Sequence, residues 1–381
     1  MRICSPHCGI DPETTSGGET YEREVLRHLA MQGHAIDIVL ARHKRYPDGV
    51  PNWTIHRLPI GRGMRWPVAA VLLPPIIKRI YRDTGFDLLR AHSLRYIGPA
   101  ALVARRVLGV DVPIVAHHHH LDPGWLNPVL EGRVMRGVDR VVVGSEFAAR
   151  QAAAELGVPR DRMAVVYYGV DHRFERRPKS STLRRRLSLG DGPVVLFLGG
   201  LKPRKNLFFL LDVWRDVRRE RPDAQLVIAG SGPLHAPLRE RASSLGLAES
   251  VVFTGFVRED EKVDVYNLAD VFFFPSSMEG FGLSVAEAMS CEVPVVISDR
   301  GSLPELATDG DGGFVCRAGD ARAFTEKILA LLADSMLRRK FGAANRERVD
   351  RMFRWDHCAA ATARVYDEVV HAWRQRRAQA R

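Results

Sequence analysis

Residues 271–287 read VFFFPSSMEGFGLSVAE, and this stretch decides the fold. The four apolar residues at 271–274 predict a strand that is buried on both faces, as in parallel sheets. A loop with two glycines follows, and the apolar-periodic run at 285–290 predicts a helix. The loop carries Glu279, and Glu287 lies eight positions further on, in the first turn of that helix. Strand, glycine loop and helix in this order indicate one step of an α/β fold.

The same alternation continues on both sides of this stretch. Further strands, most of them separated by helical patterns, are predicted at 1–4, 35–40, 87–91, 112–116, 140–143, 163–167, 193–198, 224–229, 251–253 and 294–298. Between 172 and 191 the chain is rich in Arg, Lys, Ser and Pro and lacks an apolar stripe. We therefore predict two doubly wound Rossmann-like domains facing a cleft, residues 1–172 and 173–355, with a last helix at 356–381 that packs back on the first domain.

The composition is that of a soluble globular protein. The chain has 381 residues, of which 46% are hydrophobic, so it has enough apolar material for two cores. Its net charge of +11 is spread over both halves, whereas a nucleic-acid-binding arm would concentrate it, so no nucleic acid partner is expected. Cysteines 4, 8, 291, 316 and 358 form no paired framework, which favours reduced thiols in the cytoplasm. The longest apolar run, 66–77, is broken by prolines and is too short to span a membrane.

Ligands of open α/β sheets bind at the carboxyl ends of the strands, so the residues after each predicted strand are candidates for a site. The stretch 199–206, Gly-Gly-Leu-Lys-Pro-Arg-Lys-Asn, follows one such strand and places Lys202, Arg204 and Lys205 within four residues. Lysine meets a diphosphate as a point charge, and arginine binds it through two parallel hydrogen bonds. The stretch indicates an anion site, and a solvated basic turn is the alternative.

Glu279 and Glu287 flank a loop whose glycines let backbone amides approach a ligand. The helix that starts near Ser284 offers free amides and a positive dipole end, which suits a diphosphate. Glu279 could accept hydrogen bonds from sugar hydroxyls, and Glu287 from a ribose. For Glu287 an equal alternative is a capping box, in which Ser284-x-x-Glu287 bonds back to the helix start.

Two further stretches follow strands in the first half of the chain. Gly17 and Gly18 open a helical pattern, where they form either a phosphate-binding turn or a simple tight turn. Four histidines at 117–120 follow the strand 112–116, and alternate ones face opposite sides, which splits them as metal ligands. We favour one histidine as a hydrogen-bonding partner in the cleft, and we expect no metal. Asp309-Gly-Asp311 is interpreted as a turn.

Taken together, these stretches resemble the retaining GT-B glycosyltransferases related to glycogen and sucrose synthases, and bacterial mannosyl- and N-acetylglucosaminyltransferases of the same group. The resemblance covers nearly the whole chain. It is carried, in the family's order, by Gly17-Gly18, Gln32-Gly-His34, Tyr167-Tyr-Gly-Val-Asp171, Gly230-Ser-Gly-Pro233, Thr254-Gly-Phe-Val257 and the two-glutamate stretch from Glu279 to Glu287.

The resemblance implies a donor site for a nucleotide diphosphate sugar, which is a substrate, so no cofactor is expected. The residues that it assigns to donor binding are Gly17, Gly18, Arg204, Lys205, Val257, Glu279, Phe281, Gly282, Leu283 and Glu287. Within this set Lys205 would bind the diphosphate, Glu279 the hydroxyls of the sugar, Glu287 the ribose and Val257 the base. The implied catalytic residues are His119, with His118 as the alternative in a shifted register, Glu279 and Lys205.

The chain departs from the family pattern at three positions. Gly200 stands where the family usually has an arginine, and Arg204 is expected to replace that charge. Ser284 stands where a proline is common, and Tyr168 where an asparagine is common. Glu279, Glu287 and Lys205 are all retained, so we expect the protein to be catalytically competent.

The implied activity is metal-independent hexosyl transfer with retention, from a UDP-sugar in preference to GDP-mannose. The acceptor hydroxyl belongs to a lipid-linked, saccharide or secondary-metabolite acceptor. Arg62, Arg65, Trp66 and the run that continues through Ile77-Lys78-Arg79 have two interpretations. They form either an amphipathic surface for a lipid-linked acceptor, with peripheral contact at the inner face of the membrane, or a proline-broken core segment, which is favoured. A UDP-sugar epimerase on the same fold and a non-catalytic sugar-nucleotide sensor are the alternative functions. The oligomeric state is left open.

Overall fold

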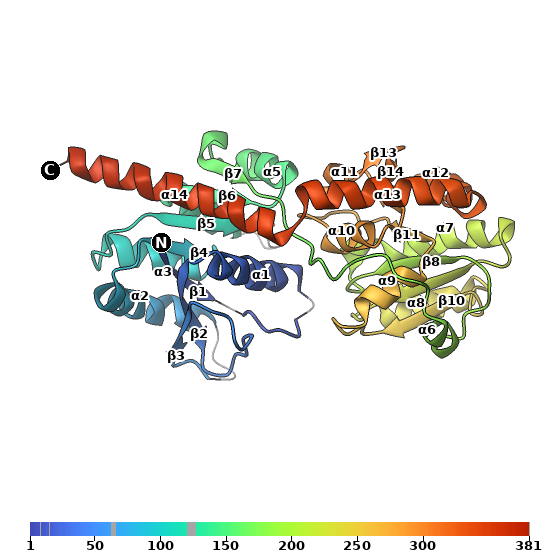
Figure 1. The fold of residues 1–381 in the computed structure, drawn as a ribbon, viewed down its shortest axis with the longest axis horizontal. Helices are drawn as coiled ribbons and strands as arrows, with labels where there is room; N and C mark the ends of the chain where they lie inside the picture. Colours follow the sequence, from blue (N-terminus) through green and yellow to red (C-terminus); the bar gives the residue numbers. More distant parts are fainter. Residues whose placement is uncertain (8, 15, 62–65, 120–126, 381) are drawn as a thin grey trace. The chain divides into compact units, whose positions relative to one another are not determined.

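The computed structural model describes residues 1–7, 9–14, 16–61, 66–119 and 127–380. It divides the chain into two compact units (Figure 1). Unit 1 comprises Met1–Gly169 and Trp355–Arg381, and unit 2 comprises Val170–Arg354. Each unit holds its own parallel sheet with helices between the strands, so the predicted class of two doubly wound Rossmann-like domains is confirmed.

Unit 1 has, among its described residues, a seven-stranded sheet in the order β3-β2-β1-β4-β5-β6-β7, with parallel neighbours. Its elements are β1 (Arg2–His7), α1 (Gly17–Met31), β2 (Ala35–Ala41), β3 (Trp53–Leu58), α2 (Trp66–Thr84), β4 (Leu88–Ala91), α3 (Ile97–Arg106), β5 (Ile114–His118), α4 (Asn127–Gly137), β6 (Arg140–Val143), α5 (Glu146–Leu156), η1 (Arg160–Arg162), β7 (Met163–Val165) and α14 (Trp355–Gln379). The long helix α14, red in Figure 1, packs against α1.

Unit 2 repeats this architecture, with a described seven-stranded sheet in the order β10-β9-β8-β11-β12-β14-β13. Its elements are α6 (Ser181–Arg186), β8 (Val194–Leu198), η2 (Pro203–Lys205), α7 (Leu207–Glu220), β9 (Gln225–Ala229), α8 (His235–Ser244), β10 (Val251–Gly255), α9 (Lys262–Leu268), β11 (Val271–Phe274), α10 (Leu283–Ser290), β12 (Val295–Ser298), α11 (Leu303–Leu306), β13 (Thr308–Asp309), β14 (Gly312–Cys316), α12 (Ala321–Ala333) and α13 (Ser335–Met352).

Each sheet has a switch point at which the strand order reverses, and such a point is where open α/β sheets bind ligands. In unit 1 it lies between β1 and β4, and in unit 2 between β8 and β11. Both central strands of unit 2 are fully buried, because their side chains are apolar on both faces. The polar residues that follow these strands therefore stand on a rigid base.

The sequence analysis missed the edge strands β3 and β13, and β14, which lies next to β13. β3 reads WTIHRL and is half exposed, so it lacks the continuous apolar run of the central strands. β14 begins with two glycines, which carry no side chain for the pattern to detect. Edge strands need to bury less surface, and their sequence signal is weaker for that reason.

The proline-containing run near residue 70 forms the long helix α2, which continues through Pro74 and Pro75. Leu73, Ile77 and Ile80 on this helix are buried in the core of unit 1. The structure therefore supports the interpretation of this run as a core segment along that face. Arg62 and Arg65, which the sequence analysis also considered, lie outside the described residues. No helix in the described part of the chain is long and apolar enough to cross a membrane.

Candidate functional site

A cluster of three charges stands at the switch point of unit 2, where the loops after β8 and β11 touch. The Nζ atom of Lys205 lies 2.6 Å from Oε1 of Glu279, and Nη1 of Arg204 lies 2.8 Å from the same oxygen. Lys205 also lies over the ring of Phe274, 4.5 Å from its centroid. Lys205 and Glu279 are buried, whereas the Arg204 side chain is 47% exposed. The structure thus brings together three residues that the sequence assigned to donor binding.

Hydrogen bonds fix the loop that carries Glu279. The hydroxyl of Ser276 donates to Oε1 of Glu279 at 2.7 Å, and the hydroxyl of Ser302 donates to the carbonyl of Phe281 at 2.9 Å. Gly301 has a φ of 63°, and a Cβ atom there would lie only 2.5 Å from the carbonyl oxygen of Glu279. A larger residue at 301 would displace the loop. The sequence analysis missed these three supporting residues, because nothing in the sequence marks them as neighbours of Glu279.

The electrostatics of the cluster keep Glu279 ionised. Burial alone would raise the pKa of its carboxyl, but the nearby Lys205 and Arg204 lower that pKa below its usual value. Burial lowers the pKa of Lys205, and Glu279 opposes that effect. Two cations and one carboxylate leave one net positive charge, and Arg204 is accessible to solvent. The cluster therefore has the charge and the donors to bind an anion such as a diphosphate.

The glycine loop ends at a helix start that offers backbone amides. Gly282 is the N-cap of α10 with a φ of 100°, and a Cβ atom there would come within 3.0 Å of the Leu303 and Leu306 side chains. Leu283 is the first helical residue, so the amides around it have no partner within the helix. Phe281, just before, is buried and anchors the loop.

Glu287 does not cap its own helix, so the capping-box alternative is wrong. The N-cap is Gly282 rather than Ser284, and the Glu287 carboxylate instead accepts a hydrogen bond from the Tyr266 hydroxyl at 2.7 Å. Its other oxygen lies 3.5 Å from Nζ of Lys262. Burial raises the pKa of the Glu287 carboxyl, and Lys262 opposes that effect. Glu287, on α10, thus contacts two residues of α9 rather than the Lys205 cluster.

The turn after β9 lies directly against the loop after β8. Gly230 and Gly232 have φ values of 138° and 158°, and a Cβ atom on either would collide with the backbone, 2.0 Å from the Gly199 oxygen and 2.5 Å from the Leu201 oxygen. Both glycines are therefore required by close approach of two backbones. Val257, the residue assigned to the base, is buried in the segment that follows β10.

In unit 1, two predicted donor residues come together at the start of α1. This helix begins at Gly17, and its N-cap Ser16 makes no side-chain capping bond. A Cβ atom on Gly18 would lie 3.9 Å from Cδ2 of His119, which places the histidine ring beside the first turn of the helix. Helix-start amides and an imidazole side by side suit a polar ligand.

The histidine run alternates as the strand geometry predicts. The two ring nitrogens of His117 are hydrogen-bonded to the hydroxyls of Tyr21, at 3.1 Å, and Tyr366, at 2.7 Å. His117 therefore connects α1 and α14 inside unit 1. His119 lies on the same side of the chain and is 17% exposed in its side chain. His118 is buried at the end of β5. His120 lies outside the described residues.

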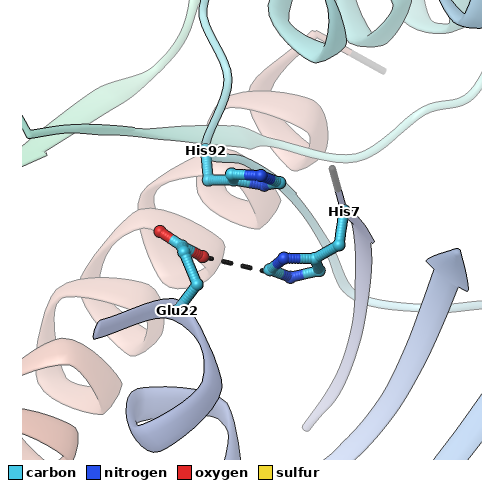
Figure 2. A group of neighbouring side chains, drawn as sticks. All are labelled: His7, Glu22 and His92. Atoms are coloured by element: carbon cyan, nitrogen blue, oxygen red, sulfur yellow. Dashed lines mark ion pairs between the residues drawn. The ribbon is translucent and has the colours of Figure 1, made fainter. Parts of the chain in front are cut away.

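The sequence analysis missed a buried polar group below His119. Glu22, on α1, forms an ion pair with the buried Arg90 and a hydrogen bond with His119, whose Nε2 atom lies 2.8 Å from Oε1 of Glu22. Figure 2 shows the Glu22 carboxylate directed toward His7, 3.9 Å away, beside the His92 ring, which stacks on His7. These residues come from β1, α1 and the ends of β4 and β5, at the switch point of unit 1.

His7, Glu22 and His92 are also residue types that bind divalent metals, and their ligand atoms lie within 4.8 Å of one another. Burial lowers the pKa of both histidines, that of His92 to about 4, so both are neutral at pH 7. The guanidinium of Arg90, however, contacts the same carboxylate oxygen of Glu22 that faces His7. This fixed positive charge opposes a cation in the group.

Comparison with known proteins places these features in a family. The model of the glycosyl transferases group 1 matches residues 180–348, and that of glycosyltransferase family 4 matches residues 15–174. The chain is 34% identical over 307 residues to a GDP-mannose-dependent alpha-(1-6)-phosphatidylinositol monomannoside mannosyltransferase of Mycolicibacterium smegmatis, covering 75% of this chain and 78% of the relative. It is 23% identical to the N-acetyl-alpha-D-glucosaminyl L-malate synthase of Bacillus anthracis, covering 94% and 95% of the two chains.

Solved structures share the fold over almost the full length. Sucrose-phosphate synthase from Thermosynechococcus elongatus superposes with a TM-score of 0.81 at 22% identity, covering 98% of this chain and 100% of that one. HepE of Anabaena, solved in complex with UDP and glucose, gives a TM-score of 0.78 at 19% identity, covering 97% and 100%. With this fold and these sequence relatives, the chain belongs to the group 1 glycosyl transferases and is a GT-B glycosyltransferase.

Proposed function

We propose that this glycosyltransferase transfers a hexose from a nucleotide diphosphate sugar to an acceptor hydroxyl with retention of configuration and without a metal. The observation that supports the proposal most is the contact of Lys205 and Arg204 with Glu279 at the switch point of unit 2. This cluster combines a net positive charge for the diphosphate with a carboxylate for sugar hydroxyls. A nicotinamide or P-loop enzyme would need glycine motifs that the sequence lacks.

In the proposed reaction, the bond between the anomeric carbon and the diphosphate oxygen breaks first. Negative charge then grows on the leaving diphosphate, and Lys205, Arg204 and the amides around Leu283 stabilise it. All three side-chain contacts described for Glu279 are made by Oε1, which leaves Oε2 to accept from a sugar hydroxyl. The acceptor hydroxyl attacks from the face of the leaving group and gives its proton to the leaving phosphate oxygen. This route needs no protein nucleophile.

The remaining predicted residues have roles in the same proposal. Gly18, next to Gly17, donates its amide near the diphosphate, and His119 contacts the donor sugar near the reacting carbon. Glu287 accepts from the ribose, and Val257 contacts the base. Binding of a ribose by Glu287 is compatible with its contacts, because the Tyr266 bond uses one carboxylate oxygen and Lys262 lies 3.5 Å from the other.

The names of the relatives and of a solved complex suggest candidates for the donor base and for the acceptor. A UDP-sugar is favoured by the resemblance, and the solved HepE complex contains UDP. GDP-mannose is the alternative, because the relative from Mycolicibacterium smegmatis is named GDP-mannose-dependent. The names of two relatives contain phosphatidylinositol monomannoside and L-malate. We therefore test two kinds of acceptor, a lipid-linked one with peripheral membrane contact and a soluble hydroxyl compound.

Transfer is tested by incubating the protein with UDP-glucose, UDP-N-acetylglucosamine or GDP-mannose and with either phosphatidylinositol vesicles or soluble hydroxyl acceptors. Release of nucleoside diphosphate that requires an acceptor is the expected result. The anomeric proton of the product should show by NMR the same configuration as the donor. A product of inverted configuration would contradict retention. Donor rearrangement or hydrolysis without any transfer would favour the epimerase.

A further inference from the structure

His119 is held at both ring nitrogens by residues of its own unit. Its Nε2 atom lies 2.8 Å from Oε1 of Glu22, and its Nδ1 atom is hydrogen-bonded to the hydroxyl of Tyr168. The Tyr168 ring lies edge-on to the imidazole, with centroids 5.7 Å apart. Both partners are buried, whereas the His119 side chain is 17% exposed and its Cδ2 atom lies beside Gly18. The two hydrogen bonds therefore fix the orientation of a ring that is still partly accessible to solvent.

Glu22 is in turn anchored at its second oxygen. Oε2 of Glu22 forms an ion pair with the Arg90 guanidinium, and Nε of Arg90 donates to the Tyr366 hydroxyl at 2.9 Å. Burial would raise the pKa of the Glu22 carboxyl, but Arg90 and the histidines lower it well below its usual value. An ionised carboxylate can only accept, so Nε2–H of His119 donates to Glu22, and Nδ1 is left to accept from the Tyr168 hydroxyl.

We propose that Glu22, anchored by Arg90, is a positioning residue that fixes the Nε2–H tautomer and the ring orientation of His119 beside the first turn of α1. Tyr168 completes the clamp from the other side. Tyr168 stands where the resemblance has an asparagine, so this clamp belongs to the particular sequence of this chain. The inference rests on the proposed function, in which His119 contacts the donor sugar. A side chain that is held in its reactive orientation before the substrate binds lowers the barrier of the reaction, so its loss should affect kcat more than KM.

The kinetic test places Glu22→Gln in two backgrounds, the natural chain and His119→Asn. In the natural chain we expect kcat to fall at least tenfold while the donor KM changes less than threefold. In the His119→Asn background the same substitution should change kcat less than threefold, because there is no imidazole left to position. An equal loss of kcat in both backgrounds, or no loss in either, would overturn the proposal.

A matched control exists in the same unit. Asp37 is also a buried carboxylate held by an arginine and a histidine, Arg2 at 2.6 Å and His56 at 2.8 Å, but it lies on β2 and away from His119. Asp37→Asn should lower the thermal midpoint and leave kcat within threefold of the natural value.

If Glu22→Gln does not fold because Arg90 is left unpaired, two further variants test the same proposal. The double variant Glu22→Gln with Arg90→Met removes both charges, and Tyr168→Phe removes the hydrogen bond to the other ring nitrogen of His119. Each should lower kcat without a matching rise in KM.

A second measurement is independent of turnover. Two-dimensional ¹H–¹⁵N NMR of the imidazole nitrogens should show the Nε2–H tautomer for His119, with its signal identified by its absence in His119→Asn. Glu22→Gln should shift this signal or mix the tautomers. An Nδ1–H tautomer, or a signal that Glu22→Gln leaves unchanged, would overturn the positioning role. Absence of transfer with every donor would instead contradict the proposed function while the NMR result still decides the role of Glu22.

Discussion

At the scale of the residue, two clusters of charged side chains differ in how far their members are exposed. In unit 2, Lys205 and Glu279 neutralise each other while Arg204 remains accessible, so the group is ready to receive an anion. In unit 1, Glu22 and Arg90 are both buried, and the Glu22 carboxylate contacts both Arg90 and His119, which is the basis of the positioning role proposed for Glu22. We expect the exposed charged group to bind a ligand and the buried ones to position a neighbouring side chain.

Removing either partner of the unit 2 cluster should impair transfer. We expect Lys205→Ala and Glu279→Ala each to lower kcat/KM by roughly tenfold or more, which corresponds to about 1.4 kcal/mol per decade of transition-state stabilisation. Steady-state kinetics with the preferred donor measures this loss. Lys327→Ala is a matched control, because Lys327 on α12 also lies over a phenylalanine ring, 4.5 Å from the centroid of Phe314 on β14. Natural turnover in both folded site variants would contradict the assignment.

His92 should make the stability of unit 1 depend on pH. Burial lowers its pKa to about 4, against about 6.5 in an unfolded chain. The unfolded state therefore binds more protons between these values, and the free energy of unfolding should rise with pH from about 4 to about 6.5. Between pH 5 and pH 7 this histidine alone predicts a gain of about 2 kcal/mol.

The measurement for His92 is chemical denaturation at pH 5, 6 and 7, compared with His92→Gln. The variant should show a smaller rise in unfolding free energy than the natural chain, because glutamine does not titrate. The exposed His371, bonded to Gln375 on α14, gives the control substitution His371→Gln, whose pH profile should match that of the natural chain. Equal slopes in the His92 variant and the natural chain would show that His92 is not the titrating group.

The residues of the unit 2 site could be predicted from the sequence, and the support of His119 could not. Lys205 and Glu279 directly follow apolar strands, and strand ends meet at one edge of a parallel sheet. Arg90 and His119 lie 68 and 97 positions after Glu22 in the sequence. Their contact with Glu22 depends on the rotation of α1 about its axis. Periodicity identifies the buried face of that helix, but it does not say which polar groups that face meets.

At the scale of the element, glycines set where loops can approach one another. Gly282 caps α10 in a left-handed conformation, and Gly301 packs against the backbone of Glu279. Central strands were predictable because their apolar runs are continuous, whereas β3 at a sheet edge and β14, the second strand from an edge, were missed because their runs are interrupted. The start of α10 was predicted two residues too late, because Gly282 rather than Ser284 is the cap.

Substitution of Gly282 should therefore destabilise the turn that joins the Glu279 loop to α10. Gly282→Ala places a Cβ atom in a strained backbone conformation and against two leucine side chains, so we expect a loss of about 1–3 kcal/mol in stability. It should also weaken nucleotide binding. Gly319→Ala is the control, because Gly319 also has a positive φ, 88°, but no atom within 4 Å of the added Cβ. Thermal unfolding of both variants measures the difference, and equal losses would mean that the contact with the leucines has no effect.

At the scale of the whole molecule, the chain consists of two units of the same architecture, each with polar residues at its switch point. The last helix of the chain, α14, belongs to unit 1, where its Tyr366 hydroxyl bonds both His117 and Arg90. The end of the sequence thus supports the polar group near its beginning. A truncation before α14 is expected to destabilise unit 1, since it would expose these buried polar side chains.

The central claim, that the chain uses a nucleotide diphosphate sugar, is tested most directly by thermal unfolding with UDP, GDP, ADP and TDP at high concentration. A ligand at about 100 times its dissociation constant stabilises the folded protein by about 2.7 kcal/mol, which moves the transition by several degrees. We predict a rise in the midpoint with UDP or GDP that is lost in Lys205→Ala. A midpoint that none of the four nucleotides changes would contradict the account.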